Sequence, residues 1–205
     1  MTQNKNVLIG YKLFFSLLGF SAIVTEIATI VERGRFNPAN FFSFFTVESN
    51  VLAFAVLLLS AVAVAWGKNH KLDGLRGAVT VYMLIVGIGF SFLLAGLEGI
   101  ALTAVAWDNT VLHYIMPTAM LIDFLIDRPK RTLAFKKFLY WLLFPVVYVA
   151  YSLTRGALTG WYPYPFLNPD TSGYGATAFA ASCLLVLGVS LVWGVCKLSG
   201  RQKVA

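Results

Sequence analysis

The chain has 205 residues, of which 59 % are apolar and only 12 % are charged, against roughly 25 % charged residues in soluble domains. A core of this size cannot hide so much apolar surface from water, which excludes a soluble domain and predicts an integral membrane protein. The net charge of +7 is not arranged as a basic face with interleaved aromatic residues. We therefore expect membrane lipids as partners and no nucleic acid.

Six apolar stretches are long enough to cross a bilayer as helices, which need about 20 residues each. In chain order they cover residues 7–31, 41–66, 76–103, 110–126, 137–155 and 176–197. Their short connections predict antiparallel neighbours in one bundle. The expected fold is all-α, a single transmembrane domain over residues 1–205 with six membrane-spanning helices.

The basic residues favour one side of this bundle. Of the 16 lysines and arginines, all but three lie at the two chain ends or in the second and fourth connections. The three exceptions are Arg33, Arg35 and Arg155. By the positive-inside rule, both termini are predicted to be cytoplasmic in a multi-pass protein.

Polar side chains inside apolar spans are costly and are functional hypotheses by default. From the rise per residue, Thr46 and His113 are expected about 7 Å and about 5 Å below the outer ends of their helices. Glu26, Glu98 and Arg155 fall near the outer ends of theirs. Five of the six helices thus bring a polar group to one level, which predicts a shared polar cavity in the outer third of the membrane.

Helical spacing groups further polar residues into two stripes, on the second and fifth helices: Ser43, Thr46, Ser49 and Asn50, and Tyr148, Tyr151, Ser152 and Arg155. Structural explanations exist for the same residues. Hydroxyls in membrane helices often bond to a carbonyl one turn earlier, a lone histidine is often a structural donor, and charges near helix ends reach the headgroups. Asp123, close to the basic fourth connection, is expected to anchor its helix at the cytoplasmic interface.

Several chemistries are excluded by what the sequence lacks. His70 and His113 are predicted near opposite membrane surfaces, so they cannot share a haem, and neither a zinc motif nor a phosphate loop is present. Neither metal nor cofactor is expected. What remains is a hydroxyl and an imidazole at one depth, with Thr46 as nucleophile and His113 as base. Asn50, one turn from Thr46, is placed to orient the site or to donate to an oxyanion.

Three short motifs are spread over most of the chain: Phe44-Phe45-Thr46, His113 with Pro117 four residues later, and Gly160-Trp161 followed by Tyr164-Pro165-Phe166-Leu167. In these motifs and their spacing the chain resembles the androgen-induced and androgen-dependent TFPI-regulating membrane protein family, including its small bacterial relatives. One departure is that Asn50 follows Thr46 by four residues, where the animal members carry their amide or acid three residues on.

The resemblance implies a threonine hydrolase of fatty acid esters of hydroxy fatty acids in a bacterial inner membrane. It assigns Thr46 as nucleophile and His113 as base. An amphiphilic ester is expected to enter from the outer leaflet, with its carboxylate toward Arg155 and the loop 161–174 over the mouth. The residues expected to bind substrate are Asn50, Glu98, Tyr151, Arg155 and Trp161.

Two other classes of protein fit the same residues. A small proton-linked transporter or channel would use a relay of intramembrane acids and an imidazole: Glu26, Glu98, His113 and Asp123. The sequence shows neither a repeat nor a clear pair of broken helices, which such transporters often have. A non-catalytic lipid-binding protein would keep the pocket without the reaction. Labelling of Thr46 by a fluorophosphonate probe distinguishes the hydrolase from both alternatives.

Overall fold

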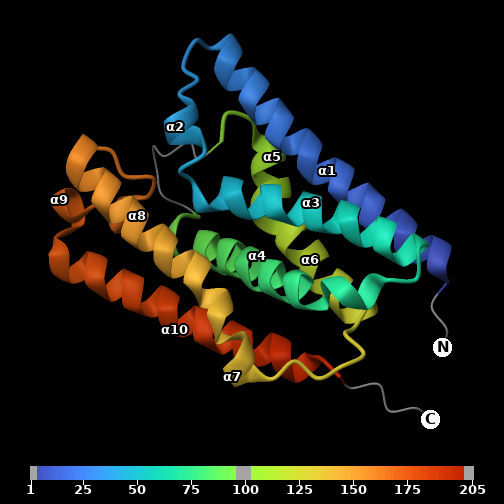
Figure 1. Cartoon of the computed structure of the whole chain (residues 1–205). Helices are drawn as coiled ribbons and strands as arrows, with labels where there is room; N and C mark the ends of the chain where they lie inside the picture. The colour runs from blue at the N-terminus through green and yellow to red at the C-terminus, as the bar shows by residue number, and fades with distance from the viewer. Residues whose placement is uncertain (1–3, 96–102, 201–205) are drawn as a thin grey trace.

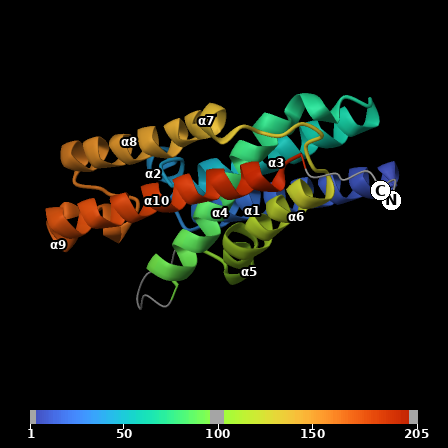
Figure 2. The same cartoon turned by 90° about the horizontal axis from the view of Figure 1, so that it is seen from below.

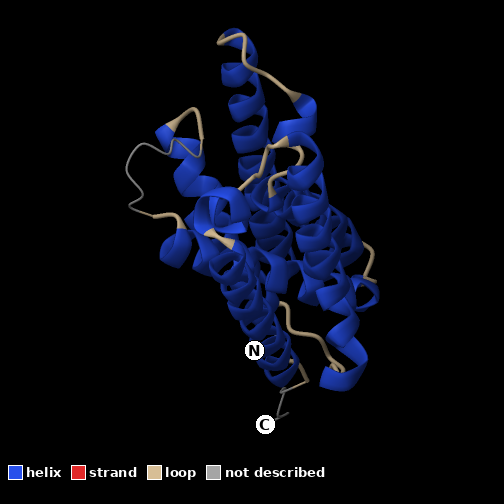
Figure 3. Ribbon diagram, turned by 90° about the vertical axis from the view of Figure 1, so that its left-hand side faces the viewer, coloured by secondary structure: helices blue, strands red, loops and turns tan. Residues whose placement is uncertain are grey.

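A computed structural model describes residues 4–95 and 103–200, and in that part of the chain it contains helices and connections but no strand (Figure 3). The α-helices are α1 (Lys5–Glu32), α2 (Pro38–Phe41), α3 (Phe45–Ala65), α4 (Asp73–Leu93), α5 (Ala106–Thr110), α6 (Met116–Ile126), α7 (Phe135–Phe138), α8 (Leu143–Thr159), α9 (Pro169–Ser172) and α10 (Tyr174–Leu198). Within the described residues, six helical spans are long and apolar enough to cross a membrane. The predicted all-α membrane fold is confirmed.

Helix α4 lies at the centre of the bundle and contacts α3, α6 and α10, while α1 packs along α3 (Figure 1). Seen from below, α10 runs across α4 with α8 beside it (Figure 2). Helix α1 begins and α10 ends at the same end of the bundle, as an even number of crossings requires. The short α2 and α9 lie toward the opposite end.

The third predicted helix ends at a different residue from the one expected, and the fourth begins at a different residue. The third was expected over 76–103 but α4 ends at Leu93, where the N–H groups of Leu94 and Ala95 both bond to the Phe90 carbonyl. The part of the predicted helix over residues 96–102 lies outside the described residues. The fourth span begins at Ala106, four residues before the predicted 110.

The second predicted helix, 41–66, is broken near its start. Helix α2 begins at Pro38, with the Asn37 side chain accepting a hydrogen bond from the Asn40 N–H at 3.2 Å. The chain then bends, and α3 begins only at Phe45. This break places Thr46 in the first turn of a long helix rather than inside one. The remaining three spans begin and end within four residues of their predicted limits.

A cluster of buried charges joins α1, α4 and α6. Lys12, Arg76 and Asp123 are fully buried. The Lys12 ammonium lies 2.5 Å from one Asp123 oxygen, and the Arg76 guanidinium lies 2.9 Å from the other. Asp127 lies 3.0 Å from Lys12 and 3.2 Å from Arg76. The expectation that Asp123 anchors its helix at the interface is therefore wrong, because two neighbouring helices each turn a cation inward toward it.

Candidate functional site

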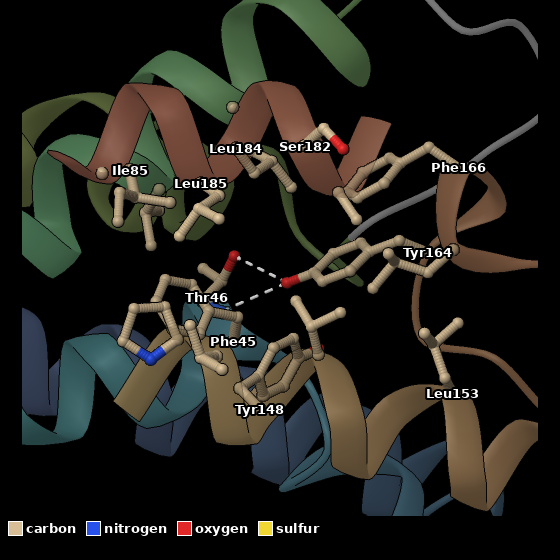
Figure 4. Close-up of a pocket in the computed structure, with 18 of the residues that line it drawn as sticks. Phe45, Thr46, Ile85, Tyr148, Leu153, Tyr164, Phe166, Ser182, Leu184 and Leu185 are labelled. Carbon is tan, nitrogen blue, oxygen red and sulfur yellow. Dashed lines mark hydrogen bonds between the residues drawn. The ribbon is translucent and has the colours of Figure 1, made fainter. Parts of the chain in front are cut away.

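Thr46 contacts a residue from the last long loop. Phe44, whose side chain cannot accept a hydrogen bond, stands at the N-cap of α3, so the N–H groups of the first turn need other partners. The Thr46 N–H donates to the Tyr164 hydroxyl at 3.2 Å, and Thr46 Oγ1 lies 3.3 Å from the same oxygen (Figure 4). The two hydroxyls thus meet in a site where both side chains are buried.

His113 lies in a π-helical turn, Val111–Ile115, between α5 and α6. Pro117, four residues later, has no N–H to give to the His113 carbonyl, so the α-helical hydrogen-bond ladder is interrupted here. The Met116 N–H bonds five residues back to Val111 instead. Such turns are frequent at functional sites, because they reorient one side chain within a helix.

The His113 imidazole has a defined tautomer. Its Nδ1 lies 3.0 Å from the Asn109 carbonyl oxygen, which can only accept a hydrogen bond. Nδ1 therefore carries the proton, and Nε2 is the basic nitrogen. The ring is 4 % exposed and stacks on Phe90 with the ring centroids 4.0 Å apart. In this tautomer Nε2 can take up a proton, as a general base must.

Asn50 connects the Thr46 and His113 segments. Its fully buried side-chain amide donates to the Thr46 carbonyl at 2.9 Å and to the Leu112 carbonyl at 3.1 Å. Leu112 directly precedes His113 in the π-helical turn. The amide thus fixes the two segments relative to each other, and its contacts are with their backbones.

Thr46 and His113 line one small cavity of about 280 Å³, which we call the polar cavity. Its wall also contains Glu26, Arg33 and Tyr164. Helix α3, the π-helical turn before α6 and the last loop therefore meet at this cavity. Their equal depth predicted a shared cavity for Thr46 and His113. A hydroxyl, an imidazole and a guanidinium thus line the same cavity.

A second cavity of about 450 Å³ lies between α4, α8 and α10, and we call it the apolar cavity. Its walls are mainly aliphatic and aromatic, including Ile85, Tyr148 and Leu184 (Figure 4). Thr46 and Tyr164 line this cavity as well as the polar one. The two hydroxyl-bearing side chains thus form the partition between an apolar compartment and a polar one.

The charged residues of the polar cavity are held by backbone groups. Both Glu26 carboxylate oxygens accept from the Ala104 N–H, at 2.9 and 2.8 Å, and the Arg33 guanidinium donates to the Ala104 carbonyl at 3.0 Å. Glu26 is buried, so it does not reach the headgroups. These bonds attach the end of α1 to the segment before α5, and Arg35 lies in the same cavity wall.

The described residues that the sequence predicts to bind substrate lie outside the walls of the two cavities. Asn50, Tyr151, Arg155 and Trp161 line neither of them. Arg155 donates to the Asn40 side chain at 2.6 Å and lies over the Trp161 ring at 4.5 Å. The Tyr151 hydroxyl is 2.7 Å from that of Ser43. Glu98 lies outside the described residues.

Sequence reasoning missed the position of Tyr164 and the presence of Arg33 and Arg35 in the wall of the polar cavity. Tyr164 stands in a loop motif with other aromatic residues, a composition that also occurs in interfacial belts. Its burial raises the pKa of the phenol above the ordinary value, so the hydroxyl keeps its proton. Among the described residues, no three His, Cys, Asp or Glu side chains gather as a metal-binding group.

No family model, curated protein or solved structure matches the chain. Membership of the family that the motifs resemble therefore stays a prediction. The function has to be argued from the geometry of Thr46, His113 and the two cavities.

Proposed function

We propose that this chain is a hydrolase of a bacterial inner membrane that cleaves ester bonds of amphiphilic lipids, such as fatty acid esters of hydroxy fatty acids. The observation that supports this proposal is the position of Thr46 between an apolar and a polar cavity, with His113 in the polar one. An amphiphilic ester likewise has an apolar part and a polar part. With its acyl chain in the apolar cavity, its carbonyl lies beside the Thr46 hydroxyl.

The sizes and linings of the cavities suit such a substrate. The apolar cavity of about 450 Å³ lies within the roughly 300–1,000 Å³ of small-molecule sites, which are mostly apolar with a few placed polar groups. The polar cavity presents Arg33 and Arg35, whose guanidinium groups pair well with carboxylates. We assign the substrate carboxylate to these two arginines in place of Arg155, which lines neither cavity.

The reaction proceeds through an acyl-threonine. Thr46 Oγ1 bonds to the ester carbonyl carbon while its proton moves to Nε2 of His113, and the carbonyl π electrons form an oxyanion. The oxyanion collapses, the bond to the alcohol oxygen breaks, and the alkoxide takes the proton from His113. A water molecule then gives a proton to His113 as its oxygen attacks the acyl group. Collapse releases the acid, and the proton returns to Thr46.

The test uses the purified full-length protein in detergent or in lipid vesicles. Release of fatty acid is measured from a fatty acid ester of a hydroxy fatty acid, and covalent labelling is measured with a fluorophosphonate probe. We expect the wild-type protein to be active and labelled, and Thr46→Ala to show neither property. Equal hydrolysis by both proteins, or none by the wild type, would contradict the proposal.

A further inference from the structure

Tyr164 has a position that the acyl-transfer steps above do not use. Its hydroxyl contacts both the N–H and the Oγ1 of Thr46, at 3.2 and 3.3 Å. Its ring stacks on Phe166, with centroids 5.1 Å apart and planes 5° apart, and meets the edge of Phe44 at 5.7 Å. Packing on both sides thus directs the phenol oxygen at the first turn of α3 (Figure 4).

Ester cleavage by Thr46 requires donors beside Oγ1. As Oγ1 attacks, the carbonyl oxygen becomes an anion that is still attached to the carbon bonded to Oγ1. Donors placed about 2.7–3.1 Å from that anion supply much of the rate enhancement in acyl transfer. The donors must therefore lie next to Thr46, on the side reached from the apolar cavity.

The Tyr164 oxygen occupies such a position. It accepts the Thr46 N–H, a donor at the positive end of a 21-residue helix. It also borders the apolar cavity, where the acyl chain is placed. When a carbonyl oxygen takes over the Thr46 N–H, the displaced Tyr164 hydroxyl remains beside it with its own proton to donate.

We propose that the Tyr164 hydroxyl and the Thr46 N–H together form the oxyanion hole, so that Tyr164 is a catalytic residue that stabilises the tetrahedral intermediate. This inference rests on the proposed hydrolase function and adds to it the group that binds the developing charge. In the substrate-free protein the Tyr164 oxygen accepts the Thr46 N–H. In the reaction both turn to the same substrate oxygen.

The Tyr164 hydroxyl could instead be only a cap for α3, accepting the Thr46 N–H. The two roles differ in the direction of the hydrogen bond. A cap needs an acceptor, which a phenolate supplies better than a phenol. An oxyanion hole needs a donor, which is lost when the phenol ionises. Experiments that separate donation from acceptance therefore decide between the roles.

The first experiment compares Tyr164→Phe with Tyr82→Phe, which removes a similarly buried hydroxyl that donates to the Trp141 carbonyl at 2.9 Å outside both cavities. For Tyr164→Phe we expect kcat to fall on the order of 100- to 1,000-fold, as for other lost oxyanion donors, with KM within threefold of wild type. An alkyl trifluoromethyl ketone, which forms an anionic hemiketal with the nucleophile, should lose affinity in parallel. Tyr82→Phe should change neither quantity by more than threefold.

The second experiment keeps the ring and the hydroxyl but makes the phenol more acidic, by placing 3,5-difluorotyrosine at position 164. We expect kcat to fall with rising pH at a lower pH than in the wild type, because the ionised phenol can no longer donate. A kcat for Tyr164→Phe within threefold of wild type, or a fluorotyrosine protein whose rate persists as its phenol ionises, overturns the proposal. In either case, loss of activity in Thr46→Ala would leave the hydrolase function standing.

Discussion

Lys12 and Asp123 lie 111 positions apart in the chain, yet their side chains meet at 2.5 Å with both fully buried. Arg76 approaches the same carboxylate from α4, with its Nε 3.0 Å from Oδ2. Three helices that are not consecutive in sequence are thus joined by one acid. A cation removed from this cluster leaves an uncompensated charge in the bundle, which is more costly than the pair was favourable.

The cluster predicts a large stability effect at Lys12. Lys12→Met should lower the free energy of unfolding by about 3–5 kcal/mol, the usual cost of removing one partner from a buried pair. Thermal unfolding in detergent, monitored by intrinsic fluorescence, measures the change. Lys5→Met is the matched control, because Lys5 is exposed and donates only to the Ala65 carbonyl. Equal unfolding temperatures for the two variants would show that the Lys12 pair is not what holds α1 to α6.

Substitutions at Thr46 and His113 should act as one unit. Thr46→Ala should abolish ester hydrolysis with little effect on thermal stability, since one hydrogen bond contributes about 1 kcal/mol. Thr46→Ser should keep part of the rate, because it retains a hydroxyl but loses the β-branch that fixes χ1. His113→Ala should be as damaging as Thr46→Ala, and the double variant little worse than either.

The control for these variants is Thr118→Ala, an exposed threonine on α6 whose hydroxyl bonds back to the Tyr114 carbonyl at 2.8 Å. Its activity should match wild type. The transporter hypothesis expects the opposite pattern, with Asp123 essential for ion flux into vesicles and Thr46 dispensable. Additive losses in the Thr46 and His113 double variant would argue against a shared catalytic step.

Asn50 should affect rate and stability together. Asn50→Ala removes the donor to the Thr46 and Leu112 carbonyls, which should cost about 1–3 kcal/mol of stability for the buried group left unpaired. The nucleophile and base then lose their common support, so kcat should fall on the order of 10- to 100-fold. Steady-state kinetics below the unfolding temperature separate the two effects. Unchanged kcat in a destabilised variant would restrict Asn50 to a packing role.

The apolar cavity should set the preferred acyl chain length. Gly89 lines it, and a Cβ placed there would lie 3.9 Å from the Leu184 side chain. Gly89→Leu should therefore reduce kcat/KM for long-chain esters by about 10-fold or more relative to short-chain esters. Gly194→Leu on α10, where a Cβ would meet open space, is the control. An unchanged chain-length ratio in Gly89→Leu would place the acyl chain elsewhere.

The predicted orientation can be tested by cysteine labelling. In a protein with Cys183 and Cys196 replaced, Lys68→Cys and Lys130→Cys should react with an impermeant maleimide only from the cytoplasmic side. Asp170→Cys in α9 should react only from the outer side, because the basic connections favour the cytoplasm. Inverted membrane vesicles supply the cytoplasmic arm. Labelling of Asp170→Cys in inverted vesicles alone would reverse the orientation and place Thr46 near the inner leaflet.

The number and type of the spanning helices follow from hydropathy, because a bilayer requires long apolar helices whatever their packing. The positions at which these helices are interrupted do not follow from hydropathy. The bend before Phe45 and the end of α4 at Leu93 occur inside apolar sequence, where a helix and a bend have similar hydrophobicity. The burial of the Lys12 charge could not be predicted from the sequence either, because a lysine near the end of a span normally reaches the headgroups.

For the site, depth along a helix is readable from sequence but direction around it is less so. Thr46 and His113 were chosen because they were predicted at equal depth, and the two residues line one cavity. Equal depth also suggested Arg155, yet α8 turns this side chain toward Asn40 and Trp161. Tyr164 comes from a loop, where no helical period predicts its direction, and only the fold brings it to Thr46.

The ion cluster also bears on how the bundle is made. Ribosomes synthesise Lys12 before Asp123 and Asp127, so α1 is made with a cation whose carboxylate partners do not yet exist. Arg76 differs, because Asp73 lies three residues before it on α4 and 3.4 Å from its guanidinium. An unpaired cation in a spanning helix opposes insertion, by about 2.5–3.5 kcal/mol at the helix centre and by less for Lys12, which lies in the first third of α1. The docking of α6 brings the Asp123 carboxylate to both cations. Helix insertion and bundle closure are thus coupled steps, and a nascent chain that stops before α6 presents an unpaired Lys12, by which an incomplete bundle differs from a finished one.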